Sequence, residues 1–440
     1  MQQIQAVHKR PASPTAQWRL RPDEIGTSLT MEELLNLFMF LYLALNGIYT
    51  NIFNLLQMSY GSIKIASYLV TVSFWTLTSI TFFRNRTRIH WELWTCRFAF
   101  VFLVYGLASV AWGTVSITVM LVPSITGICT FLYYNYLIDR FSLNDFTRML
   151  VWAFGFLLVT SIILSVAYPS VGLDNGSSDM DNAGSWQGCF SQKNLLGITA
   201  ALAFAVSVGL RPKSDVDRLW RWVVILSALV CSYYSQSRES WIAIGFQVIF
   251  FLLMRTFRNI QPRSRFPILV TGLGAFAIAV ALVFYNLDAA LALIGRTRTL
   301  SHRTDLWEAT ILLIRKRPWF GYGTYGVWNT PNAWTAVVRE RWNVTSSHNN
   351  YLEVLLSYGI VGLALYLPII GSALLYIFRA LMSYDLRDLE VPIYVMITIL
   401  ILSMAVPLIM YSPSIGMVLM LYGVSQLERV ERSGFMRLRS

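Results

Sequence analysis

Residues 345–370, which read TSSHNNYLEVLLSYGIVGLALYLPII, join a polar segment directly to an apolar run. No charged residue occurs from Val354 to Phe378, and this run is long enough to cross ~30 Å of hydrocarbon. Similar runs recur along the whole chain, in which 55% of the residues are hydrophobic and 13% are charged. A soluble domain carries about 25% charged residues. The sequence therefore predicts an all-α integral membrane protein.

About twelve apolar segments are candidates for membrane-spanning helices. They lie at roughly 34–56, 63–83, 96–112, 115–138, 149–169, 194–210, 219–236, 240–256, 266–286, 349–378, 391–410 and 412–427. Arginine-rich loops follow the even-numbered segments, and the N-terminal region is also basic, so the positive-inside rule puts both termini in the cytoplasm. The net charge of +12 is explained by these loops, and we expect no nucleic-acid partner.

This topology divides the chain into five parts. Residues 1–30 form a cytoplasmic tail, 31–287 hold spans 1–9, 288–348 form a periplasmic loop, 349–428 hold spans 10–12, and 429–440 form a second cytoplasmic tail. The first part lacks the apolar core and the cleavage site of a signal peptide. Four scattered cysteines indicate neither a disulfide framework nor a metal cluster.

The long predicted loop contains one amphipathic helix, in the segment SHRTDLWEATILLIRKRPWFGYG at 301–323. Ser301 or Thr304 could cap its start, and Pro318 and Gly321 end it. The helix is too short to span, so we expect it on the membrane surface or packed over the bundle. The aromatic-rich stretch that follows fits an interfacial belt, but it also fits a surface on which sugar rings stack.

Two cations stand at predicted outer membrane boundaries, Lys193 at the start of span six and Arg238 in the tight turn between spans seven and eight, and Arg303 lies in the helix of the long outer loop. A boundary cation is usually a snorkelling anchor. The turn around Arg238 is short enough to fix its position, however, and boundary charges can also face a pathway or cavity. If the three converge, they form a cradle for a diphosphate.

His348 is one of four histidines and lies at the mouth of span ten. Capping by Ser346 or Ser347 would put its imidazole in the first helical turn. The positive end of the helix dipole and nearby arginines would disfavour the imidazolium, and a neutral imidazole is what a general base requires. A histidine that only hydrogen-bonds at the interface is the alternative. Asn349 and Glu353 could orient groups at the same mouth, although Glu353 could equally be a buried structural carboxylate.

Four segments resemble the O-antigen ligase and polymerase superfamily, bacterial membrane enzymes that act on lipid-linked glycans. They are GCFSQKNLLG (188–197), SQSRESWIAI (235–244), HRTDLWEATILLIRKRPWFGYG (302–323) and SHNNYLEVLLSYGIVG (347–362). The resemblance covers roughly residues 90 to 425. It implies a GT-C-like fold with about twelve spans and a large periplasmic loop between spans nine and ten.

The resemblance also implies a reaction and a site. His348 matches the family's essential histidine and would act as the general base. Lys193, Arg238 and Arg303 match its cations and would bind the diphosphate, with Arg238 also stabilising the transition state, and Asn349 would lie beside the substrate. The donor would be an oligosaccharide on polyprenyl diphosphate, and the acceptor a lipid-linked repeat or lipid A core. We expect inversion at the anomeric carbon, no metal and no cofactor, at the periplasmic face of the bacterial inner membrane.

Several functions remain open at this stage. The SQKNLLG wording favours a polymerase of exopolysaccharide or O-antigen repeats over a ligase that moves glycan onto lipid A core. Transfer to a protein serine shares the same donor, and a chain-length regulator is left open as a partner. A transporter or flippase of lipid-linked glycan is the alternative from another class, but it predicts related halves and midplane charges, and neither is found.

Overall fold

The computed structural model describes residues 31–44, 59–176, 182–285, 303–328, 346–382, 389–408 and 414–433. These ranges are helical, apart from loops and one isolated bridge between Leu173 and Trp186. The helices are α1 (Met31–Ala44), α3 (Tyr60–Arg84), α4 (Trp94–Ala108), the 3-10 turn η2 (Ser109–Ala111), α5 (Ile117–Arg140), α6 (Leu143–Ala167), α7 (Pro169–Gly172), α8 (Lys193–Gly209), α9 (Asp215–Tyr234), α10 (Arg238–Arg258), α11 (Pro262–Tyr285), α13 (Arg303–Lys316), α15 (Asn350–Leu381), α16 (Glu390–Leu402) and α17 (Ile415–Arg432).

The predicted all-α membrane fold is confirmed in its coarse features. Each of the twelve predicted segments overlaps one long helix, and two of them also reach the short elements η2 and α7. Six helices in the described part of the chain are long and apolar enough to cross a membrane, namely Gly61–Arg84, Trp94–Ala111, Ile117–Arg140, Leu143–Ala167, Arg238–Arg258 and Asn350–Leu381. Helices α8 and α16 are apolar but shorter. The full count of twelve spans and the sidedness of the loops remain predictions.

Several helices begin where a serine can cap them. Ser59, Ser142, Ser214 and Ser414 each accept a hydrogen bond from the backbone N–H three residues later. This bond satisfies one of the N–H groups that a helix start leaves without an intrahelical partner. Ser142 and Ser214 are followed at the third position by an aspartate, and the negative charge suits the positive end of the helix.

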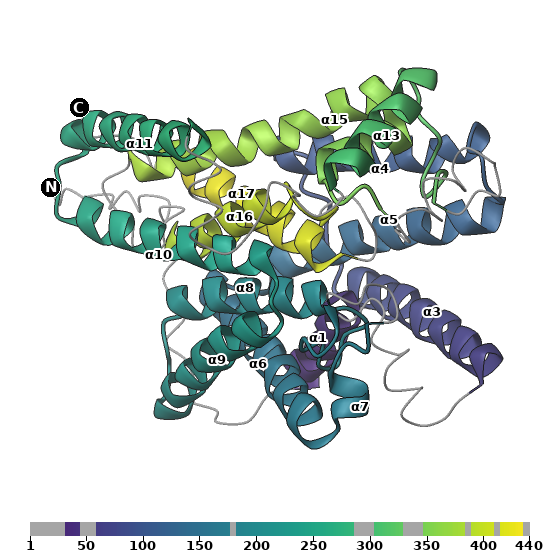
Figure 1. Ribbon diagram of the computed structural model, residues 1–440, viewed down its shortest axis with the longest axis horizontal. Coiled ribbons are helices and arrows are strands. Elements are labelled where there is room, and N and C mark those ends of the chain that lie inside the picture. The colour runs from purple at the N-terminus through teal and green to yellow at the C-terminus, as the bar shows by residue number, and fades with distance from the viewer. Residues whose placement is uncertain are drawn as a thin grey trace, which may run out of the picture.

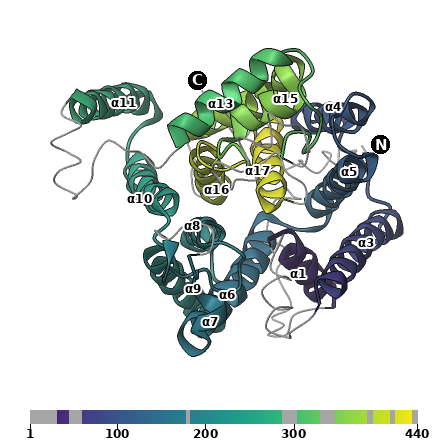
Figure 2. The same cartoon turned by 45° about the vertical axis from the view of Figure 1, so that its right-hand side comes forward.

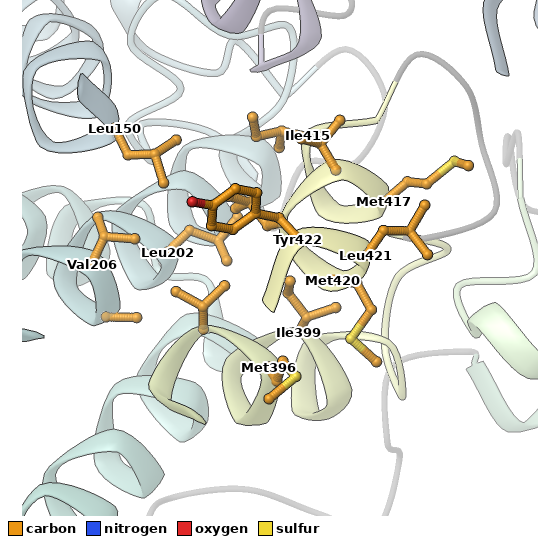
Figure 3. Packing of buried hydrophobic residues seen from close by; sticks show 14 of the residues in the cluster. Leu150, Leu202, Val206, Met396, Ile399, Ile415, Met417, Met420, Leu421 and Tyr422 are labelled. Carbon is orange, nitrogen blue, oxygen red and sulfur yellow. The ribbon is translucent and has the colours of Figure 1, made fainter. Parts of the chain in front are cut away.

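Helix α8 occupies the centre of one half of the bundle, where α6, α9, α10 and α16 pack around it (Figures 1 and 2). Small buried residues let these backbones come close, as is usual between membrane helices. Four of them on α8 are alanines: Ala200, Ala201, Ala203 and Ala205. Larger side chains of α16 and α17 fill the space beside it, with Leu202 of α8 and Tyr422 of α17 near each other in Figure 3.

A polar cluster holds the ends of α5 and α17 against the α3–α4 connection. The buried imidazole of His90 lies 2.7 Å from an oxygen of Glu92 and 2.6 Å from an oxygen of Asp139. A guanidinium nitrogen of Arg429 is 2.9 Å from the same ring. Buried charges need such partners. These residues belong to helix ends and loops that the topology assigns to the cytoplasmic side.

Helix α15 is interrupted at Gly359, and the segment after α13 docks into the break. Gly359 has φ +66° and ψ −166°, and a Cβ there would lie 2.2 Å from the carbonyl oxygen of Trp319. The backbone N–H of Ile360 donates to Pro318 O at 2.8 Å, and that of Gly323 donates to Ser357 O at 2.8 Å. Only glycine allows both the backbone conformation and the close approach. The break therefore fixes α13 over α15.

The loop helix packs over the bundle, which was one of its two predicted placements. Leu306 and Leu313 of α13 join Tyr322, Trp328 and Leu356 in a separate buried cluster. Tyr322 and Trp328 are thus packing residues, whereas Trp319 remains 62% exposed. The other predicted aromatics, Trp334 and Trp342, lie outside the described residues, as does the predicted cap Ser301.

Candidate functional site

The turn between α9 and α10 spans only Ser235 to Ser237. Gln236 adopts φ +51°, and the N–H of Ser235 closes the end of α9 by donating to Cys231 O at 2.9 Å. Arg238 is the first residue of α10 and its side chain is exposed. Glu239 follows, and its carboxylate accepts a hydrogen bond of 3.1 Å from the Ser237 hydroxyl. The short turn therefore fixes a cation and a carboxylate side by side.

The start of α8 lies against this turn. A Cβ on Gly197 would be 2.4 Å from the Cβ of Ser237, so the two backbones approach as closely as a glycine permits. Lys193, the first residue of α8, is half-buried and lies four residues before Gly197. Residues four apart share one face of a helix. Lys193 and Arg238 therefore lie at the same end of the bundle.

Helix α13 connects the start of α10 to the segment that carries His348. Its first residue, Arg303, forms an ion pair with Glu239. One turn later, the indole N–H of Trp307 donates to Ser347 O at 3.0 Å. Because Arg303 and Trp307 share a face of α13, the guanidinium of Arg303 is directed to the same region as residues 347–348.

The helix that follows His348 is capped by Asn349, and the predicted cap at Ser346 or Ser347 is wrong. The side-chain oxygen of Asn349 accepts from the N–H groups of Tyr351 and Leu352 at 3.0 and 3.1 Å. Ser347 is engaged otherwise, since its hydroxyl donates to Asn349 O at 2.9 Å. His348 consequently lies before α15 and not in its first turn.

The backbone of His348 adopts φ +49°, an uncommon conformation for a residue with a side chain. Such strain costs about 1–3 kcal/mol and persists only where neighbours impose it. Here Glu353 imposes it, because its buried carboxylate accepts the N–H of Ser347 at 2.7 Å and the indole N–H of Trp328 at 2.6 Å. Of its two predicted roles, Glu353 has the structural one.

The surroundings of His348 keep its imidazole neutral. Burial lowers the pKa of His348, the positive charge of Arg303 also lowers it, and the negative charge of Glu239 raises it, which together bring the pKa to about 4. The imidazole is therefore uncharged near pH 7, which agrees with the sequence-based expectation. The side chain of Asn349 is held at both polar atoms, since its amide nitrogen donates to Met404 O at 3.3 Å and its oxygen caps α15.

Contacts thus link four of the predicted residues, and they add one that the sequence reasoning missed. Lys193 and Arg238 are joined through the α8–α10 approach, and Arg303 is joined to His348 through α13. The added residue is Glu239, and its position directly after Arg238 on a short turn is the sequence signal that points to it. Within the described residues, no group of His, Cys, Asp and Glu side chains has the arrangement of a metal site.

The fold and this end of the molecule define a multi-pass helical membrane protein in which Arg303 acts on a neutral, buried histidine. Residues 222–367 match the model of the family described as O-antigen ligase. The matched range holds Arg238, Glu239, Arg303 and His348, while Lys193 lies outside it. The resemblance read from the four sequence segments is confirmed.

Three curated relatives are similar over parts of the chain. The exopolysaccharide production protein ExoQ of Rhizobium meliloti is 27% identical over 225 residues, which are 48% of this chain and 51% of the relative. An uncharacterized protein of Haemophilus influenzae is 26% identical over 40% of this chain and 47% of its own length. The general O-oligosaccharyltransferase of Acinetobacter baylyi is 22% identical, over 39% of this chain and 32% of the relative. The matches span about half or less of these relatives.

Proposed function

We propose that the protein is a metal-independent, inverting glycosyltransferase of the bacterial inner membrane that polymerises polysaccharide repeat units at the periplasmic face. The donor is an oligosaccharide on polyprenyl diphosphate, and the acceptor is a sugar hydroxyl of a second lipid-linked glycan. The observation that carries the proposal is the contact chain that runs from α8 through the start of α10 and along α13 to His348. It gathers three cations and a neutral imidazole at one end of the bundle.

In the proposed reaction the acceptor oxygen attacks the anomeric carbon as its proton moves to the imidazole of His348. The bond from this carbon to the donor diphosphate breaks, and the electron pair leaves on the phosphate oxygen. Lys193, Arg238 and Arg303 stabilise the charge that grows there. Removal of one such preorganised group typically costs about 100- to 1000-fold in rate. The donor linkage supplies the free energy, so no further reactant is needed.

A role in exopolysaccharide assembly is favoured because the match to the exopolysaccharide production protein ExoQ has the higher identity and covers more of both chains than the match to the O-oligosaccharyltransferase. Ligation of glycan onto lipid A core remains the second candidate, since it uses the same donor and the same site, and the matched family is described by that activity.

The test uses the purified full chain with lipid-linked oligosaccharide from the source strain and a metal chelator, with products separated on a gel. A ladder of lengthening lipid-linked glycan is expected, and it is lost in His348→Ala and Arg238→Ala. Arg255→Ala is the matched control, because Arg255 is an exposed arginine at the opposite end of the same helix.

Other results would assign another function. Transfer only after addition of lipid A core would make the protein a ligase. Absence of both products, or full activity of folded His348→Ala, would contradict the proposed transferase.

A further inference from the structure

We propose that Glu239 is a displaceable counter-ion of Arg303: the donor's diphosphate takes over the guanidinium, and the released carboxylate then supports His348 as the proton acceptor. The inference rests on the proposed function and deepens it. It assigns Glu239 as a positioning residue that acts through Arg303 and His348 and does not contact the reacting atoms.

The pair has the geometry of an exchangeable contact. One carboxylate oxygen of Glu239 meets Arg303, and the other is held by the Ser237 hydroxyl at 3.1 Å. The side chain of Glu239 is 12% exposed, so its charge needs a partner, whereas that of Arg303 is 29% exposed and open to a ligand. A diphosphate carries more negative charge than one carboxylate and can bind a guanidinium in bidentate fashion. It therefore competes well for Arg303.

After Arg303 has bound the diphosphate, Glu239 can still pair with His348. The α13 contacts bring Arg303 and residues 347–348 to one region, and both Glu239 and Arg303 act electrostatically on the imidazole of His348. The other charged groups near this mouth are placed differently: Glu353 is bound to Trp328 and Ser347, and Lys193 and Arg238 begin α8 and α10. Glu239 is thus the carboxylate positioned to pair with an imidazolium that forms at His348.

The proton balance of the reaction makes this pairing useful. In the donor-free protein the imidazole has a pKa of about 4, and such a weak base accepts a proton from a sugar hydroxyl poorly. When the diphosphate neutralises Arg303, the effect that disfavours imidazolium is reduced and that of Glu239 is no longer offset. Both changes make His348 more basic. The acceptor hydroxyl is then deprotonated only when the donor is bound, and Arg303 returns to Glu239 after lipid diphosphate leaves.

Glu239→Gln separates this role from a structural one, because it should move binding and turnover in opposite directions. Without the carboxylate Arg303 is available at once, so the KM for donor should fall by roughly 3- to 10-fold. The imidazole stays weakly basic, so kcat should fall by about 10-fold, and the acidic limb of the kcat–pH profile should move to lower pH. Glu239→Asp should restore much of kcat. Glu308→Gln, an exposed carboxylate on α13, is the control and should match the wild type.

A binding experiment tests the exchange without any turnover. Farnesyl diphosphate should bind detergent-solubilised Glu239→Gln about 3- to 10-fold more tightly than the wild type, and this gain should vanish in Glu239→Gln combined with Arg303→Gln. Equal or weaker binding, or loss of kcat with unchanged KM and no rescue by aspartate, would overturn the inference. If no glycan product forms in any variant but the tighter binding is seen, the exchange stands and the proposed reaction fails.

Discussion

The depressed basicity of His348 predicts a specific acid sensitivity of the folded state. The pKa of His348 is lowered from 6.5 to about 4, mainly because burial disfavours the charged imidazole. Each pKa unit is worth about 1.4 kcal/mol, so the interval corresponds to about 3 kcal/mol. Between pH 6.5 and 4 the unfolded chain binds a proton at this position and the folded protein does not. Stability therefore falls as the pH falls through this window, and it rises again with rising pH.

His348→Gln removes the titrating group while keeping a polar side chain of similar size. We expect the difference in free energy of unfolding between wild type and variant to change by about 3 kcal/mol from pH 7 to pH 4, in favour of the variant at pH 4. Unfolding in mixed micelles, followed by tryptophan fluorescence at several pH values, measures this difference, and all other titrating groups cancel in it. A difference that stays constant over the window would refute the argument, as would an imidazole NMR titration of His348 near its ordinary pKa.

Three further changes test the packing that holds the site. Gly359→Ala should destabilise the protein by about 2 kcal/mol or more in thermal melting, because of the positive φ and the contact with Trp319 O. Gly371→Ala on the same helix is the control, since a Cβ there would have nothing within 4 Å, and its stability should stay within about 1 kcal/mol of wild type. Gly197→Ala should lower the free energy of unfolding by about 1–3 kcal/mol, and adding Ser237→Gly to this variant should recover part of the loss. If the double variant is as unstable as Gly197→Ala alone, the α8–α10 contact is not the cause of the loss. Trp328→Phe leaves the Glu353 carboxylate without its indole donor and should lower the free energy of unfolding by about 1–3 kcal/mol. Glycan assembly should fall as well, because the segment that carries His348 is held less firmly. Unchanged melting and activity would contradict this role.

The positions of the helices could be predicted from the sequence because each long apolar run has one stable form in a membrane, a hydrogen-bonded helix. The same reasoning located Lys193 and Arg238 at helix starts, since a cation beside an apolar run marks a boundary. The short turn before Arg238 was also readable, because only Ser235, Gln236 and Ser237 separate two long apolar segments.

Features that depend on contacts between distant segments could not be read in this way. Ser347 and Asn349 are both good caps, and the choice between them is made by Glu353, which takes the N–H of Ser347. In the sequence, Gly359 is one more glycine in an apolar run, and the break is explained only by the docking of residues 318–323 against it. Likewise, Glu239 pairs with Arg303, which lies 64 residues away in the sequence, and no local pattern indicates that pair.

The first residues of the helices differ between the two ends of the bundle. Helices α6, α9 and α16 begin with acidic residues in their first turns, as the positive end of a helix favours. Helices α8, α10 and α13 begin with Lys193, Arg238 and Arg303 at the end that holds His348, although Glu239 and Asp305 also lie in the first turns of α10 and α13. Such an arrangement disfavours the protein by itself, and it becomes favourable when an anion lies where the helix starts meet. Glu239 and Asp305 supply negative charge there in the donor-free protein, and a diphosphate would supply more. The three cations at these helix starts therefore fit an anionic ligand on electrostatic grounds that do not depend on any relative.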